Sequence, residues 1–180
     1  MARVDDTLAA DDYDEFGLLH ENAEEWGLPF AGRPPVERQT FELPSGDELS
    51  YIRWGTEPAE IVFLHGGGQN AHTWDTVVLA LGRPAVAVDL PGHGHSYRRP
   101  DRNYLPWSNA AAVATMLEQV APNAAAIAGM SLGGATTIRL AATRPDLCRS
   151  AVIVDVTPQI NDPARELTTT ERGSVSLIMG

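Results

Sequence analysis

Four short runs of apolar residues recur along the chain, and none of them alternates with polar residues. They lie at residues 60–64, 84–89, 124–128 and 150–155. A strand that is covered on one face alternates between apolar and polar residues, whereas a strand of a parallel sheet is buried on both faces and reads as a continuous apolar run. The four runs therefore predict four strands of a parallel sheet.

Helix-like segments separate these runs, at roughly residues 72–82, 107–121 and 132–144. Strands that alternate with helices are typical of a doubly wound α/β fold, in which helices cover both faces of the sheet. The ligand site of such a sheet forms at the carboxyl ends of its strands. We therefore expect the chemistry in the loops that directly follow the four apolar runs.

Before the first of these runs, the pattern predicts a hairpin and a helix. Residues 39–43 and 48–54 are strand-like and flank the turn sequence Pro-Ser-Gly-Asp, which favours an N-terminal β-hairpin. Residues 8–26 place apolar side chains at helical spacing between acidic ones. Such a helix either binds a partner or packs on the domain, and we favour packing.

The predicted helices and strands divide the chain into three parts. We predict an acidic N-terminal helical arm at residues 1–35, an α/β core at residues 36–158, and the start of a cap or lid at residues 159–180.

Composition and charge exclude several classes of function. The 180 residues carry a net charge of −11 and no lysine, so a Schiff base, a P-loop lysine and a basic face for nucleic acid are all absent. No run of about 20 apolar residues and no basic-then-apolar leader occurs, which argues against a membrane partner and favours the cytoplasm. The single cysteine, Cys148, cannot form an internal disulfide, and we expect it to be buried and inert.

The strongest chemical signal is the pentapeptide Gly129-Met-Ser131-Leu132-Gly133, which lies between a predicted strand and a predicted helix. A serine hydroxyl is a weak nucleophile and must be exposed to a base. A sharp turn from strand to helix exposes it, and glycines two residues before and after relieve the crowding. We predict Ser131 as the nucleophile and the Leu132 N–H as one oxyanion donor. The alternative is a serine that merely caps a helix.

A second signal, Leu-His65-Gly-Gly67-Gly68, follows the apolar run at 60–64. Consecutive glycines leave N–H groups free to face a developing negative charge, so a second oxyanion donor is expected here. Gly67 is our first choice and Gly68 our second. His65 could be a catalytic base, but we expect it to support the glycine loop through hydrogen bonds.

A third signal is the sequence Asp89-Leu-Pro-Gly-His93-Gly-His95-Ser96. Two histidines suggest a metal, but a structural zinc site needs about four protein ligands and a catalytic one about three. We therefore expect a hydrogen-bonded structural turn, and we predict neither a metal nor a cofactor.

Taken in order, these motifs and the later Val-Asp155-Val-Thr-Pro resemble the α/β-hydrolase fold superfamily over roughly residues 38–158. They look most like its carbon–carbon bond hydrolases and small-ester hydrolases. The resemblance implies an α/β-hydrolase-type, mostly parallel sheet, with Ser131 as nucleophile and Gly67 and Leu132 as oxyanion donors. It also implies a small-molecule carbonyl substrate and a triad completed by a carboxylate and a histidine. Haloalkane dehalogenases and typical epoxide hydrolases of this fold have aspartate as nucleophile, so those activities are not expected.

The order of a triad in this fold is serine, acid, histidine. All five histidines of this chain precede Ser131, so we expect a chain that is incomplete at its C-terminus and impaired in catalysis. Asp155 is the candidate acid, although an aspartate that orders its own loop is the interpretation we favour.

Two functions therefore remain in view. The first is a serine hydrolase that attacks a small ester, thioester, lactone or diketone. The second is a non-catalytic hydrolase scaffold or a fragment without activity. The sequence leaves the substrate and the oligomeric state open.

Overall fold

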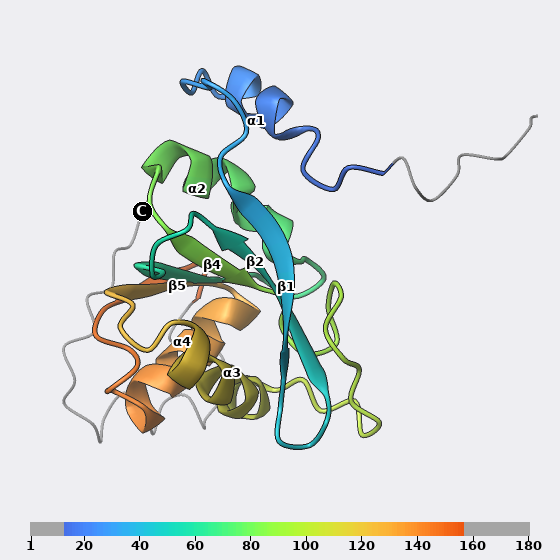
Figure 1. Ribbon diagram of the computed structural model, residues 1–180. Helices are drawn as coiled ribbons and strands as arrows, with labels where there is room; N and C mark the ends of the chain where they lie inside the picture. The colour runs from blue at the N-terminus through green and yellow to red at the C-terminus, as the bar shows by residue number, and fades with distance from the viewer. Residues whose placement is uncertain (1–12, 157–180) are drawn as a thin grey trace, which may run out of the picture.

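The computed structural model describes residues 13–156, which form a central sheet flanked by helices (Figure 1). Six strands pair in the order β1-β2-β4-β3-β5-β6. Their bounds are β1 Val36–Glu42, β2 Glu48–Trp54, β3 Ile61–Leu64, β4 Ala85–Val88, β5 Ala126–Met130 and β6 Ala151–Val154.

The directions of the strands match the predicted topology. The four strands that the apolar runs predicted, β3 to β6, are parallel to their neighbours among themselves. Strands β1 and β2 form an antiparallel hairpin, and β2 joins β4 in the antiparallel sense. A mostly parallel α/β sheet with an N-terminal hairpin is therefore confirmed.

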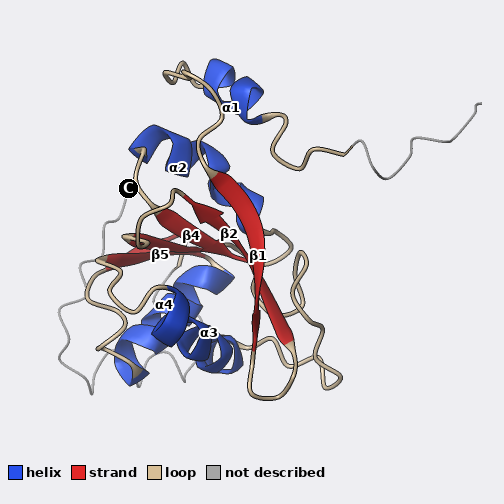
Figure 2. Cartoon of the chain, in the orientation of Figure 1, coloured by secondary structure: helices blue, strands red, loops and turns tan. Residues whose placement is uncertain are grey.

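Helices cover both faces of this sheet, as Figure 2 shows: α1 and α2 lie on one side, and α3 and α4 lie on the other. Their bounds are α1 Leu19–Glu25, the 3-10 helix η2 Ala71–Trp74, α2 Asp75–Leu81, α3 Pro106–Val120 and α4 Leu132–Thr143. The three helices predicted within the core are thereby confirmed. No helix between residues 13 and 156 is long and apolar enough to cross a membrane.

Successive residues of the central strands enter two different hydrophobic cores. In β3, Val62 and Leu64 join the core on the side of α3 and α4, whereas Phe63 joins the core under η2 and α2. In β4, Val86 faces the first core and Ala87 the second, and both are fully buried. Because side chains alternate across a strand, this two-sided burial explains why the sequence shows unbroken apolar runs.

Two expectations about the strands need correction. Strand β6 is buried on one face only, because Ala151 and Ile153 are buried whereas Val152 is partly exposed and Val154 is 41% exposed. Strand β5 lies two residues further along the chain than the predicted run, so it leads without a gap into Ser131.

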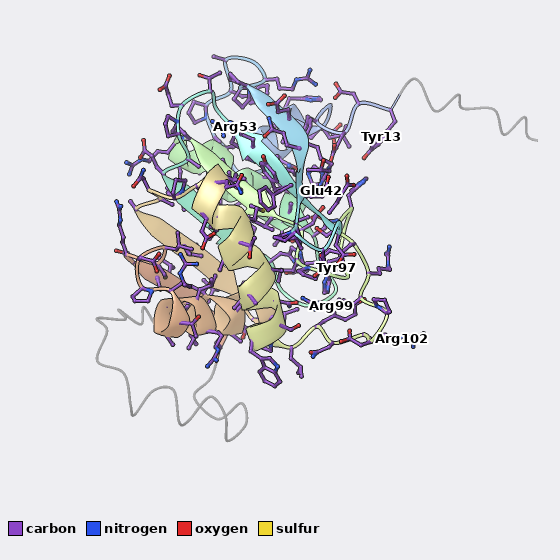
Figure 3. The ribbon with its side chains drawn as sticks, turned by 60° about the horizontal axis from the view of Figure 1, so that its bottom comes forward. Tyr13, Glu42, Arg53, Tyr97, Arg99 and Arg102 are labelled. Atoms are coloured by element: carbon purple, nitrogen blue, oxygen red, sulfur yellow. The ribbon has the colours of Figure 1, made fainter. Side chains whose placement is uncertain are left out.

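The N-terminal arm also differs from its prediction. Residues 8–12 lie outside the described part of the chain, and the helix runs only from Leu19 to Glu25. Leu19 and Ala23 are buried, but Trp26 is 66% exposed. Tyr13 is 82% exposed and lies at the margin of the molecule (Figure 3). The helical spacing thus predicted the burial of Leu19 and Ala23, and Phe16 also packs against the core although it precedes the helix. The prediction was wrong for Tyr13 and Trp26, which lie outside the helix and are exposed. The predicted cap region at 159–180 lies outside the described residues.

Candidate active site

Ser131 occupies the sharp turn between β5 and α4, and it is solvent-exposed. Its backbone angles are φ 48° and ψ −111°, a conformation that residues with a side chain rarely adopt. The turn is anchored to the sheet because the Ser131 N–H donates to the Val154 carbonyl of β6 at 2.9 Å. A strained backbone that holds a serine out of the sheet is the geometry of a nucleophile elbow.

The glycines around Ser131 are required by close backbone contacts. A Cβ atom added to Gly133 would collide with the Leu64 carbonyl at the end of β3, and it would lie 2.7 Å from the His65 carbonyl oxygen. A Cβ atom added to Gly129 would collide with the Gly133 carbonyl of the first turn of α4. The start of α4 can therefore press against β3 and β5 only because both positions lack a side chain.

The glycine loop at residues 65–68 lies against the elbow. A Cβ atom added to Gly66 would lie 3.5 Å from the Ser131 Cβ atom. The Gly66 N–H donates to the side-chain oxygen of Gln69 at 2.8 Å, so that N–H is already used. Gly67 and Gly68 are exposed, and no hydrogen bond among residues 13–156 has either of their N–H groups as donor.

The N–H of Leu132 is the first of α4. The first N–H groups of a helix have no partner within the helix, and the helix dipole makes this end electropositive. Leu132 directly follows the exposed serine and the glycine loop lies beside it, so both bring unpaired N–H donors close to Ser131. This is the arrangement that can hold a developing oxyanion.

His65 is fully buried, and backbone groups occupy both of its ring nitrogens. Its Nδ1 donates to the Gly66 carbonyl at 2.7 Å, and its Nε2 accepts the Leu90 N–H at 3.0 Å. Burial lowers the pKa of His65, which keeps the ring neutral. The expected supporting role of His65 is therefore confirmed, and neither nitrogen is free to take a proton from serine.

The loop from Asp89 to Ser96 is a hydrogen-bonded turn, as predicted. The Asp89 carboxylate accepts the His95 N–H at 3.0 Å, and the Ser96 hydroxyl donates to the Asp89 carbonyl at 2.6 Å. His93 packs edge-on against His65, with ring centres 5.0 Å apart, and His95 is exposed. No group of three or more His, Cys, Asp or Glu side chains between residues 13 and 156 could hold a metal ion.

Beyond this turn the chain continues toward α3 along a basic stretch. The Arg99 guanidinium carbon lies 5.5 Å from the Tyr97 ring centre, and Figure 3 shows the two side chains beside each other. Arg102 is exposed and has a φ of 53°.

No histidine hydrogen-bonds the Ser131 hydroxyl within the described part of the chain. One histidine, His72 of η2, is paired with carboxylates, but these belong to other residues than Asp155. Its Nδ1 lies 2.7 Å from Asp75, and its Nε2 lies 2.9 Å from Glu15. Its ring nitrogens are therefore both committed to these acids.

Asp155 directly follows β6 and neighbours the elbow. Met130 and Val154 are register partners, so Ser131 and Asp155 are the next residues along two adjacent parallel strands. Asp155 is exposed and has a φ of 54°, a second strained backbone position at the same edge of the sheet.

Two further features lie outside the elbow. Burial raises the pKa of the Cys148 thiol to about 11, which agrees with a buried and inert cysteine. A hollow of about 300 Å³ is lined by Asp14, Phe16, Gly17, His20, Phe30 and Arg33, and it contains none of the motif residues.

Sequence reasoning missed two parts of this site. The first is Gln69, which fixes the glycine loop and follows that loop directly in the sequence. The second is Arg38, which pairs with the buried Asp89 at 2.7 Å across 51 residues of sequence. A polar side chain next to a glycine run could have indicated the first, whereas no local signal indicates the second.

Comparisons with known proteins identify relatives that are named as esterases and lipases. Esterase Rv0045c of Mycobacterium tuberculosis is 53% identical over 167 residues, which are 93% of this chain and 54% of the esterase. The mouse sn-1-specific diacylglycerol lipase ABHD11 is 33% identical over 71% of this chain and 40% of the lipase. The chain thus spans about half the length of the curated relatives it matches.

Among solved structures, the M. tuberculosis esterase Rv0045c superimposes with a TM-score of 0.77 and 52% sequence identity. The match covers 87% of this chain and 52% of that one. A family model described as the alpha/beta hydrolase family matches residues 61–177, which contain the glycine loop, the elbow and Asp155. This chain belongs to the alpha/beta hydrolase family.

Proposed function

We propose that this chain is an ester hydrolase in which Ser131 attacks the carbonyl carbon of a small ester, thioester, lactone or diketone. One observation carries the proposal: Ser131 is exposed at a strained turn between strand and helix and faces a glycine loop with unused N–H groups. The relatives named as esterase and lipase support an ester as the substrate class.

In this proposal the Ser131 Oγ bonds to the carbonyl carbon while its proton passes to water, and the carbonyl oxygen becomes an oxyanion. When the oxyanion collapses, the alcohol, thiol or carbon leaving group departs and takes up a proton from water, and a second water then releases the acid from Ser131. The N–H groups of Gly67 and Leu132 donate to that oxygen. Gly67 is favoured over Gly66 because Gln69 already accepts the Gly66 N–H. Removal of a single oxyanion donor costs about 10²–10³ in kcat in comparable enzymes, so these two groups supply much of the barrier reduction.

The described residues offer no histidine that accepts the Ser131 proton through a hydrogen bond. All five histidines precede Ser131 in the sequence, and the buried His65 has both nitrogens occupied. We propose that the 180 residues by themselves hydrolyse esters slowly. Loss of a triad member leaves a residual acceleration of about 10³–10⁴ over water, which oxyanion donors and binding provide.

Asp155 is the proposed acid of the site, and an aspartate that orders its own loop is the competing role. Its place beside Ser131 at the end of β6 supports the first role. The Asp155→Asn variant separates them, because asparagine can still accept a hydrogen bond from a loop N–H but carries no charge. A lower Ser131-dependent rate in this variant supports the acid role, and an unchanged rate assigns Asp155 to the loop.

The test of the proposed function uses purified chain of confirmed mass and a p-nitrophenyl ester of a short acid. We compare the unaltered chain with Ser131→Ala and with the control Ser150→Ala, which changes an exposed serine before β6. The expected result is a slow rate that Ser131→Ala abolishes and Ser150→Ala leaves intact. Equal rates in all three chains would support the non-catalytic scaffold instead. A fast rate that Ser131→Ala abolishes would refute the impairment.

The division into arm, core and cap, the cytoplasmic location and the absence of nucleic-acid and membrane partners stay predictions.

A further inference from the structure

Besides its apolar contacts, the N-terminal arm makes one partly buried ion pair with the core, and the proposed reaction does not use this pair. Glu15 lies four residues before α1, and its Oε1 accepts the Arg38 Nε–H of β1 at 2.6 Å. The same oxygen lies 2.9 Å from His72 Nε2. The side chains of Glu15 and Arg38 are only 20% and 14% exposed, so water screens this pair weakly.

Arg38 in turn neutralises a carboxylate that has no access to solvent. Its Nη1 donates to the Asp89 Oδ2 at 2.7 Å and to the Ser50 Oγ at 2.6 Å, and Asp89 is fully buried. A buried charge is costly unless it is paired and hydrogen-bonded. The orientation of Asp89 therefore depends on where Arg38 is held.

Asp89 holds two loops at the catalytic edge of the sheet. Its Oδ1 accepts the Ala71 N–H at 2.7 Å, and its Oδ2 accepts the His95 N–H at 3.0 Å. Ala71 lies a few residues after the glycine loop that faces Ser131, and both loops lie at the carboxyl ends of parallel strands. A change in the Asp89 carboxylate is therefore transmitted to both loops.

Glu15 also bridges Arg38 and His72, because its Oε1 lies within hydrogen-bond distance of both side chains. Arg38 Nη2 lies 3.5 Å from His72 Nε2, and Asp75 of α2 accepts from the other nitrogen of His72 at 2.7 Å. The hydrogen bond to Asp75 raises the pKa of His72, despite its partial burial, and Glu15 adds to the effect. The charged groups facing His72 are thus Asp75, Glu15 and Arg38, with the Phe16 ring 5.7 Å away. Without Glu15, Arg38 and a protonated His72 would repel each other.

We propose that Glu15 of the N-terminal arm is a positioning residue, which holds Arg38 against Asp89 and thereby fixes the glycine loop beside Ser131. The effect on hydrolysis rests on the proposed function, whereas the coupling of the arm to the loops does not. Under this proposal the N-terminal arm helps to fix the loops beside Ser131.

Amide hydrogen exchange of the full chain tests the coupling without any hydrolysis. We compare Glu15→Gln with the matched control Glu24→Gln, an exposed acid of α1. Loss of one charge-assisted hydrogen bond corresponds to about tenfold in an equilibrium constant. We therefore expect the protection of the Ala71 and His95 amides to fall about tenfold in Glu15→Gln. The Leu140 amide in α4 and every amide of Glu24→Gln should keep their protection.

Unchanged protection at Ala71 and His95, or an equal loss at Leu140, would overturn the proposal. For the reaction, Glu15→Gln should lower the Ser131-dependent kcat about tenfold with little change in KM, and Glu15→Asp should restore part of it. Lower protection with an unchanged kcat would also refute the positioning role. If the unaltered chain shows no Ser131-dependent rate, the proposed function is refuted. The amide exchange result then still shows whether Glu15 is coupled to the two loops.

Discussion

Ser131 holds its backbone at φ 48° and ψ −111°, so its replacement by glycine is expected to stabilise the protein while it removes the proposed nucleophile. Residues with a side chain in such sparsely populated regions cost about 1–3 kcal/mol. Glycine removes that strain, but it costs about 0.5–1 kcal/mol through the greater freedom of the unfolded chain. The net expectation is a gain of about 1 kcal/mol in the free energy of unfolding. For a protein of this size, that gain corresponds to a rise of about 2–4 °C in Tm.

The assay is reversible urea or thermal unfolding of three variants beside the unaltered chain. Ser131→Ala keeps the Cβ atom and so keeps the strain, and its stability should change by less than about 0.5 kcal/mol because the hydroxyl is exposed. Ser150→Gly is the matched control, because Ser150 is exposed and has no positive φ. It should lose about 0.5–1 kcal/mol.

The reasoning is refuted if Ser131→Gly is no more stable than Ser131→Ala, since the two differ only by the Cβ atom. It is also refuted if Ser131→Gly and Ser150→Gly change the stability by the same amount, because the backbone at Ser131 would then carry no special cost.

Three further predictions concern neighbouring groups. Gly133→Ala should lower the free energy of unfolding in urea by about 1–3 kcal/mol, because its Cβ atom would collide with a backbone carbonyl of β3. Gly67→Ala is the control, because a Cβ atom there meets open space and should change the stability by less than about 0.5 kcal/mol. The pKa of His72 is raised by its hydrogen bond to Asp75, so its stabilising effect should be fully present below about pH 6.5 and lost as the pH rises through the higher folded-state pKa. The stability difference between the unaltered chain and His72→Gln should therefore shrink between pH 5.5 and 8.5, and a constant or growing difference would contradict this. Burial raises the pKa of Cys148 to about 11, so a thiol reagent at about pH 8 should react only after unfolding, as absorbance of the released product will show.

The strands and helices could be predicted because their burial leaves a local trace in the sequence. In β4, neighbouring residues face opposite cores and all of them are buried, so the run is apolar without a break. Strand β6 is equally apolar, but Val154 is exposed at its end. The sequence of β6 does not encode whether another strand lies beside it, so its exposure could not be predicted.

The elbow was predictable for a similar reason. Gly129 and Gly133 flank Ser131 within five residues, and the contacts that require them are made by the turn and the strand next to it. The network around Asp89 was not predictable, because Glu15 and Arg38 are 23 residues apart and Arg38 and Asp89 are 51 residues apart. Charged residues at such separations show no periodicity, and only the folded sheet brings them together.

The presentation of Ser131, the proposed nucleophile, and its activation are therefore separate properties of the proposed site. Presentation depends on backbone packing, since the missing side chains at Gly129 and Gly133 let α4 press on β3 and β5 and force Ser131 outward. Nothing in that packing requires a histidine. Activation depends on a proton acceptor near the hydroxyl, and the buried His65 is committed to the backbone. A chain that keeps the first property without the second should retain the strained serine and its stability cost while it hydrolyses esters slowly. The response of stability to Ser131→Gly and the rate of the unaltered chain are for this reason independent measurements, and each can fail without the other.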